Sequence, residues 1–126
     1  MQVFFRRFWR ISRLIPHILA GVFQSALLFG LYSRERRDRV ISMWSAKLLR
    51  ILNVRLQHQS IPMAGQGALL VANHVSWLDI FVILAVRRVH FVSKHEVRSW
   101  PVMGWLAWRA GTLFLQRAKK SDTLRI

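Results

Sequence analysis

The chain has 126 residues, which is enough for one domain. Hydrophobic residues make up 53% of it, so intrinsic disorder is excluded, because disordered chains lack the apolar residues that form a core. Twenty lysines and arginines against five aspartates and glutamates give a net charge of +15, which is typical of a protein that meets an anionic surface such as lipid headgroups or nucleic acid. The absence of cysteine excludes disulfide scaffolds, thiolate metal sites and a cysteine nucleophile.

The first third of the sequence is typical of membrane association. Residues 14–32 form an uncharged stretch of 19 residues, about 28 Å long as a helix and just long enough for a transmembrane helix. Polar residues and a proline interrupt it, and arginines flank both ends, at positions 6, 7, 10, 13, 34, 36, 37 and 39. A spanning helix usually carries its basic residues at one end. We therefore expect a helix that dips into one leaflet, or half of a helical hairpin; a secretory signal peptide is the alternative, but no small-x-small cleavage site follows.

Residues 35–52 predict a second, amphipathic helix. At 100° per residue, its apolar side chains fall within an arc of about 120° and its basic ones within a separate arc of about 80°. The apolar set is Val40, Ile41, Trp44, Leu48, Ile51 and Leu52, and the basic set is Arg36, Arg39, Lys47 and Arg50. Such a helix suits a headgroup interface. The alternative is a core-facing helix of a small bundle with a solvated charged side.

From residue 53 onward the sequence alternates between strand and helix patterns. We expect strands at 54–57, 68–72, 89–92 and 112–116, a loop at 60–67, and helices at 77–86 and 100–110. For the last helix, Ser99 is the expected N-cap, Pro101 lies in the first turn and Gly111 follows the end. This alternation predicts an α/β fold. The chain then divides into an N-terminal membrane-associated helical segment, residues 1–52, and a partial α/β domain, residues 53–126.

The segment 73–79, which reads NHVSWLD, carries the clearest chemical signal. It follows an expected strand and opens an expected helix, and α/β folds place reactive groups at the carboxyl ends of strands. His74 and Asp79 can meet only if the histidine lies on the turn and the aspartate on the first helical turn. Asp79 would then hold one imidazole nitrogen and leave the other free to take a proton. A turn histidine beside an ordinary helix-start aspartate is the alternative.

Two blocks of the sequence resemble one family. Residues 73–79 are similar to the NHxxxxD motif of the glycerolipid acyltransferases, the 1-acylglycerol-3-phosphate acyltransferase group. Residues 111–117, GTLFLQR, resemble that family's GxxFIxR motif, with Leu115 in the isoleucine place. The segments between the two blocks and the N-terminal helices are also family-like, so the resemblance covers essentially the whole chain. It implies the first part of the glycerolipid acyltransferase α/β fold.

The resemblance assigns a role to each matching residue. His74 would be the general base that deprotonates a lysolipid hydroxyl, and Asp79 would orient it. Arg117 would bind the phosphate of the acceptor, and Gly111 would let the backbone approach beside it. Asn73 and Ser76 would support the motif. The acceptor would be lysophosphatidic acid or a related lysolipid, and the donor would be the thioester of acyl-CoA or of acyl carrier protein, with no further cofactor and no metal.

The sequence departs from the family pattern at its end. The family carries a later block with a Pro-Glu-Gly-Thr core that completes the acceptor site, and the 126 residues contain none. We therefore expect an amino-terminal portion, truncated within the fold and with little or no acyl transfer by itself. The expected location is the bacterial inner membrane, among membrane lipids, with the catalytic part on the cytoplasmic side. The alternatives are a non-catalytic membrane-anchored fragment and, less favoured because no nucleic-acid-binding motif accompanies the charge, a basic nucleic-acid-binding module.

Overall fold

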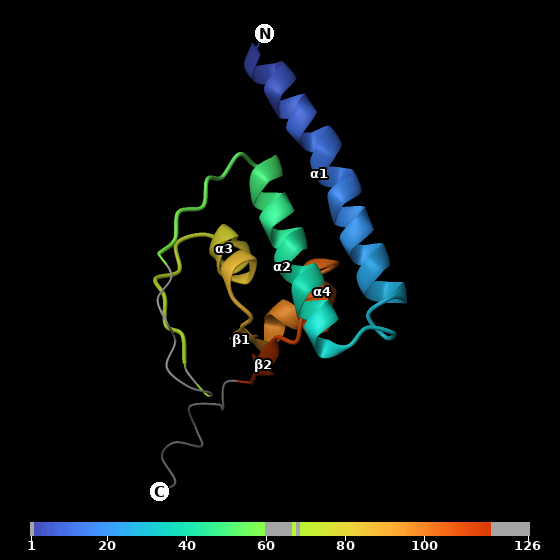
Figure 1. Cartoon of the computed structure of the whole chain (residues 1–126), viewed down its shortest axis with the longest axis vertical. Helices are drawn as coiled ribbons and strands as arrows, with labels where there is room; N and C mark the ends of the chain where they lie inside the picture. The colour runs from blue at the N-terminus through green and yellow to red at the C-terminus, as the bar shows by residue number, and fades with distance from the viewer. Residues whose placement is uncertain (1, 60–66, 68, 117–126) are drawn as a thin grey trace, which may run out of the picture.

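A computed structural model describes residues 2–59, 67 and 69–116 of the chain. In chain order the elements are α1 (Gln2–Leu27), α2 (Arg34–Ile51), α3 (Leu78–Val86), β1 (Val92–Lys94), the 3₁₀ helix η1 (His95–Ser99), α4 (Met103–Arg109) and β2 (Leu113–Leu115). Figure 1 shows α2 between α1 and α3, with the small sheet and α4 at one end of this helical layer. The fold is mixed α/β, as the sequence predicts.

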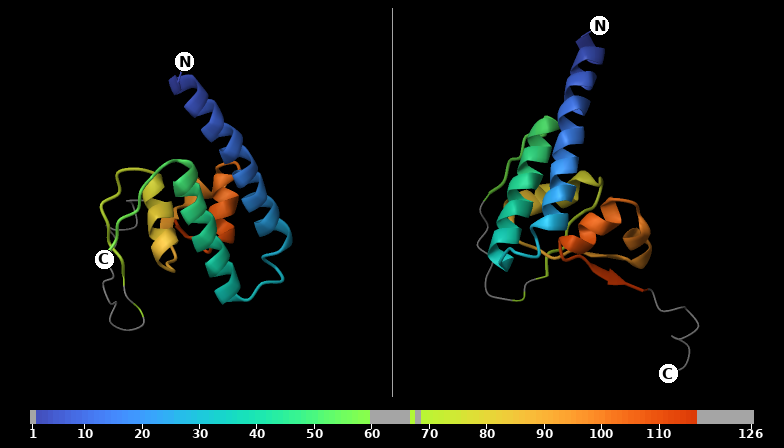
Figure 2. Two further views of the ribbon diagram at one scale, coloured as in Figure 1. Left: turned by 45° about the horizontal axis from the view of Figure 1, so that its top comes forward. Right: turned by 90° about the vertical axis from the view of Figure 1, so that its right-hand side faces the viewer.

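The N-terminal segment is a helical hairpin. α1 ends at Leu27 and α2 begins at Arg34, where the Ser33 hydroxyl accepts a hydrogen bond from the backbone N–H of Arg36. The two helices run side by side in opposite directions, and the first half of α1 projects past the end of α2 (Figures 1 and 2). α1 is therefore one half of a helical hairpin, which is one of the two expected alternatives, and the dip into one leaflet stays a prediction. The uncharged stretch 14–32 does not form one continuous helix, and no helix of the described residues is both long and apolar enough to span a bilayer.

The contacts between α1 and α2 are partly polar. His17 is buried, its ring stacks on the Trp44 indole with 4.6 Å between centroids, and its Nε2 lies 3.0 Å from the carbonyl oxygen of Trp44. The Trp44 indole N–H in turn donates to the carbonyl oxygen of His17, at 3.1 Å. A Cβ on Gly21 would lie 2.4 Å from Nε1 of Trp44, so the glycine makes room for the indole.

The hydrophobic core lies between α2 and α3. Leu48 and Leu49 of α2 and Phe81 of α3 are buried, and other apolar side chains pack around them: Leu14, Trp44, Leu52, Val54, Leu78, Val82, Leu84 and Ala85. The Ser42 hydroxyl adds a hydrogen bond to the carbonyl oxygen of Ala85, at 3.1 Å. The side of α2 that carries Leu48 thus faces the core, as one of the two interpretations of this helix predicts. Its basic residues Arg39, Lys47 and Arg50 are exposed.

The C-terminal part of the described chain is a small β-α-β unit. β1 and β2 pair in parallel with Val92 opposite Leu113 and Lys94 opposite Leu115, and η1 and α4 form the connection between them. A parallel pair needs such a crossover, because its strands run in the same direction. The predicted strand at 112–116 and the helix at 77–86 are therefore present, whereas the strand expected at 89–92 is found at Val92–Lys94 and shares only Val92 with the prediction.

The start of α4 differs from the prediction. The helix begins at Met103 and not at residue 100, and Ser99 is not its N-cap. Val102 has φ 61° and ψ −56°, and the backbone N–H of Met103 donates to the carbonyl oxygen of Pro101 at 2.6 Å. These features describe a three-residue γ-turn, which redirects the chain immediately before the helix. Gly104 then packs tightly on η1, since a Cβ there would lie 2.4 Å from the carbonyl oxygen of Arg98.

Two predicted strands are wrong. Residues 54–57 have no strand assignment, and neither do residues 69–72, the described part of the expected strand 68–72. A strand is held by hydrogen bonds to a neighbouring strand, and the described residues place none beside either segment. Leu69 and Val71 are accordingly 85% and 83% exposed. Alternating or short apolar runs predict strands only where a partner strand and a second layer cover them.

Arg109 joins the helical layer to the β-α-β unit. Its guanidinium, at the end of α4, donates hydrogen bonds to the carbonyl oxygens of Ser25 and Ala26 in the last turn of α1. These carbonyls have no partners within their own helix, and a cation also interacts favourably with the helix C-terminus. The position of α1 relative to α4 is thereby fixed by a charged side chain 84 residues away from Ser25.

Candidate active site

His74 and Asp79 meet as the sequence predicts. His74 lies on the loop before α3 and Asp79 is the second residue of that helix. Nδ1 of His74 is 3.3 Å from Oδ2 of Asp79. A carboxylate only accepts hydrogen bonds, so a neutral imidazole that donates to it through Nδ1 keeps a free lone pair on Nε2. The His74 side chain is 66% exposed, which leaves Nε2 accessible to a substrate.

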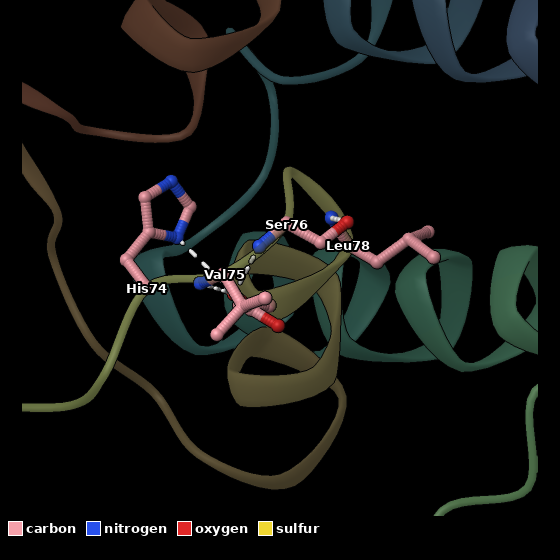
Figure 3. A network of polar contacts seen from close by, with 5 residues as sticks. His74, Val75, Ser76 and Leu78 are labelled. Atoms are coloured by element: carbon pink, nitrogen blue, oxygen red, sulfur yellow. Dashed lines mark hydrogen bonds and ion pairs between the residues drawn. The ribbon is translucent and has the colours of Figure 1, made fainter.

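The Asp79 carboxylate also organises the loop that carries the histidine. Its Oδ2 accepts hydrogen bonds from the backbone N–H groups of Val75 and Ser76, each at 2.8 Å. Figure 3 shows the His74 ring and these two N–H groups directed toward one point. The bonds from Ser76 and Val75 lower the pKa of Asp79, and the nearby His74 lowers it further. The carboxylate therefore stays ionised at neutral pH and can balance a positive charge on the histidine.

This geometry contains a helix-capping pattern. The Ser76 hydroxyl accepts a hydrogen bond from the backbone N–H of Leu78 at 3.2 Å, while Asp79 reaches back to the N–H of Ser76. A Ser-x-x-Asp sequence before an apolar run is the signature of such a reciprocal cap. Ser76 thus helps to cap the start of α3, and its support role in the motif stays a prediction. The two backbone N–H groups were absent from the predicted site, although the Ser-x-x-Asp spacing signals one of them.

Aromatic contacts attach the loop to the core. The Trp77 ring meets Phe81 edge to face with 5.8 Å between centroids, and Phe81 lies 5.8 Å from the Trp44 ring. Such pairs add about 0.5–1.5 kcal/mol beyond the burial of their area. They connect Trp77 to the helical hairpin. The motif therefore packs against the core, although residues 69–75 have no regular secondary structure.

The other predicted site residues are not joined to this pair by any described contact. Asn73 is exposed on the loop. Gly111 ends α4 with φ +84°, and its carbonyl oxygen lies 3.2 Å from Nδ1 of His90. A Cβ at Gly111 would lie 2.8 Å from that nitrogen, so the glycine allows both the turn and the approach of His90. Arg117 lies outside the described residues, and its predicted contact with the acceptor phosphate stays a prediction.

Comparisons with known proteins agree with the motif. The family model described as Acyltransferase matches residues 51–125, so the chain belongs to the acyltransferase family. The 1-acyl-sn-glycerol-3-phosphate acyltransferase of Neisseria meningitidis is 39% identical over 89 residues, which cover 70% of this chain and 35% of that protein. The protein of the same name from Neisseria gonorrhoeae is 35% identical over 94% of this chain and 47% of its own length.

A second group of relatives has a different acceptor in its name. The lyso-ornithine lipid O-acyltransferase of Pseudomonas aeruginosa is 43% identical over 90 residues, which cover 70% of this chain and 34% of that protein. The chain therefore spans less than half the length of each of these curated relatives. No solved structure matches it.

Proposed function

We propose that this chain supplies the general base of an enzyme that transfers an acyl chain to the hydroxyl of a lysolipid. The observation that carries the proposal is the contact of His74 Nδ1 with Asp79 Oδ2 on an exposed histidine side chain, an arrangement in which Nε2 of the neutral imidazole can accept a proton. Nε2 takes the proton of the acceptor hydroxyl as its oxygen attacks the carbonyl carbon of a thioester. The ionised Asp79 stabilises the imidazolium that forms. The intermediate then expels the thiolate, which takes the proton from His74, and an ester remains.

The names of the relatives limit the class of acceptor. They are acyltransferases of 1-acyl-sn-glycerol-3-phosphate and of lyso-ornithine lipid, and both acceptors are single-chain lipids with a free hydroxyl. Lysophosphatidic acid is the proposed acceptor here, with another lysolipid as the alternative. Acyl-CoA or acyl carrier protein is the proposed donor, because either presents the thioester that the reaction consumes.

We further propose that the chain acts at the surface of the bacterial inner membrane, on its cytoplasmic side. The support comes from one face of α1, where large apolar side chains are exposed along the helix: Phe4, Phe8, Ile11, Ile15 and Leu19. At 100° per residue these five fall within an arc of about 80°. A helix with such a face is suited to lie in the plane of the interface, with its apolar side among the acyl chains. This face is called the apolar stripe below.

A chimera tests the proposed chemistry. The matching segment of the Neisseria meningitidis relative is replaced by this chain, and the purified chimera is given lysophosphatidic acid and acyl-CoA. We expect acyl transfer, and we expect His74→Ala to lower kcat by about 10³–10⁴-fold, the upper range for a general base. His95→Ala is the matched control, because His95 is also exposed and lies outside the motif. An active chimera that tolerates His74→Ala would overturn the assignment of the base. An inactive but folded chimera would favour the non-catalytic alternative.

A further inference from the structure

A basic pocket lies between the first half of α1 and the end of α2, apart from the His74 loop. Its volume is about 310 Å³, and it is lined by Arg6, Trp9, Arg10 and Arg13 from α1, by Arg50 and Ile51 from the end of α2, and by Asn53 just after that helix. In Figure 2 the first half of α1 runs alongside the end of α2 and continues past it. None of the lining residues belongs to the segment 73–79. This hollow is called the arginine pocket below.

The arginine pocket holds four cationic side chains and no lining carboxylate. Within the described part of the chain, no group accepts a hydrogen bond from the side chains of Arg6, Arg10 or Arg13, and none forms an ion pair with them. Arg50 donates through Nε to the carbonyl oxygen of Ala46 in its own helix. Two carboxylates of the described chain engage other cations, since Asp38 lies 3.7 Å from Arg88 and Asp79 contacts His74. Gathered like charges repel, so an external anion would stabilise this arrangement.

The chemistry of the pocket favours phosphate as that anion. Guanidinium groups present paired donors at a fixed angle, which match two oxygens of one phosphate. Several guanidinium groups around one hollow can also share the charge of a phosphate diester or monoester. Arg6, Arg10 and Arg13 are spaced i, i+4 and i+7, so they project from one face of α1.

The opposite face of α1 favours a membrane lipid as the source of the phosphate. The apolar stripe is centred about 180° around α1 from these three arginines, and Phe4 and Phe8 in it are 77% and 63% exposed. With the stripe among acyl chains, the arginines lie at the level of the headgroups. Trp9 lines the pocket, is 57% exposed, and is of the residue type that is enriched at this level of a bilayer.

We propose that the arginine pocket binds the phosphate group of an anionic membrane lipid. The inference rests on the membrane attachment proposed above for the source of the phosphate, and it is independent of the chemistry proposed for His74. The bound lipid would hold α1 and the end of α2 together at the membrane surface, because the pocket takes residues from both.

Vesicle binding by the full chain tests the pocket against diffuse attraction. The variant Arg6→Gln/Arg10→Gln/Arg13→Gln is compared with Arg34→Gln/Arg39→Gln/Arg55→Gln, which removes three exposed arginines outside the pocket. Co-sedimentation uses vesicles of phosphatidylcholine and phosphatidylglycerol. Diffuse attraction alone predicts a loss of about a hundredfold for both triple variants. We expect the pocket variant to lose about tenfold more than the control, because bidentate contacts are lost as well. Equal losses would overturn the proposal.

Two further measurements keep the test decisive if the triple variant folds poorly. Arg10→Lys/Arg13→Lys keeps the net charge and removes the paired donors, so a phosphate pocket predicts weaker binding than diffuse charge does. Unchanged binding by this variant would count against the pocket. Inorganic phosphate, added to the detergent-solubilised chain without vesicles, distinguishes the two sources of phosphate. Saturable binding of inorganic phosphate by the wild-type chain, together with equal vesicle binding by the pocket variant and its control, would overturn the lipid assignment. Acyl transfer by the chimera is scored separately, so failure of either proposal is recognisable.

Discussion

The His74–Asp79 pair and the arginine pocket are built in opposite ways. The pair comes from seven consecutive residues, and its contacts are hydrogen bonds between positions at most five apart. The pocket takes side chains from the first half of α1 and from the end of α2, which lie more than 35 residues apart in the sequence. A site of the first kind can be recognised as a motif. A site of the second kind exists only when two helices pack in one particular orientation.

That orientation depends on a polar contact. His17 and Trp44 exchange two hydrogen bonds and stack, and they lie between the pocket and the turn of the hairpin. The His74 loop depends instead on Asp79 and on the aromatic contact of Trp77 with Phe81. Changes to one set of residues should therefore damage one site and spare the other.

A large effect is expected from breaking the local site. Asp79→Asn replaces the ionised acceptor, so His74 loses its fixed tautomer and the charge that balances its protonated form. In the chimera described above we expect kcat to fall by about 10²–10³-fold. The pocket should be untouched, and vesicle binding should not change. Steady-state kinetics and co-sedimentation on the same preparation check both halves of this expectation. A parallel loss of vesicle binding would show that the two sites are coupled.

A smaller effect is expected at Gly111, which belongs to the second motif and is approached by the distant residue His90. Gly111→Ala places a Cβ at φ +84° and 2.8 Å from Nδ1 of His90. We expect the free energy of unfolding to fall by about 1–2 kcal/mol, mainly from the left-handed backbone conformation. Urea unfolding measures it. Gly30→Ala is the matched control, because a Cβ there meets nothing within 4 Å, and it should change stability by less than about 0.5 kcal/mol.

The smallest effect concerns pH and the hairpin. Burial lowers the pKa of His17, the hydrogen bond to Trp44 raises it, and the nearby Lys47 lowers it, with a net shift downward from 6.5. The unfolded chain therefore binds a proton more readily than the folded one. The contribution of neutral His17 to stability is complete above pH 6.5. It is lost as the pH falls from 6.5 through the lower pKa that His17 has in the folded chain. Thermal unfolding from pH 7.5 to 5 checks this, with His17→Gln as the comparison. If His17→Gln keeps the full pH dependence of stability, other groups cause that dependence.

Much of the candidate site could be predicted from residues close in sequence. The meeting of His74 and Asp79 follows from the spacing at a helix start, and the Ser-x-x-Asp pattern explains why the loop holds its shape. Helix α2 follows from its apolar periodicity, and α3 lies where the sequence predicts a helix. Such features depend on contacts within one turn of helix, so they need no information about the rest of the fold.

The errors lie where a distant segment decides the outcome. Residues 54–57 and 69–72 have strand-like patterns but no partner strand among the described residues, so they stay irregular. The start of α4 is set by a γ-turn at Val102 and by the tight approach of Gly104 to η1, which no helix-start pattern contains. A strand or a helix end is a local pattern, but its formation requires partners that tertiary packing supplies.

The sequence by itself determined that arginines flank an apolar stretch near the N-terminus, and that His74 and Asp79 lie close together at one helix start. Only the tertiary structure decided which face of α1 is covered. The face that packs on α2 carries His17 and Gly21, because the Trp44 carbonyl satisfies the imidazole and the glycine leaves space for the indole. The apolar stripe consequently stays exposed, and the arginines of α1 come to lie beside Arg50. Burial of a polar group needs a hydrogen-bond partner, and that partner here is 27 residues away.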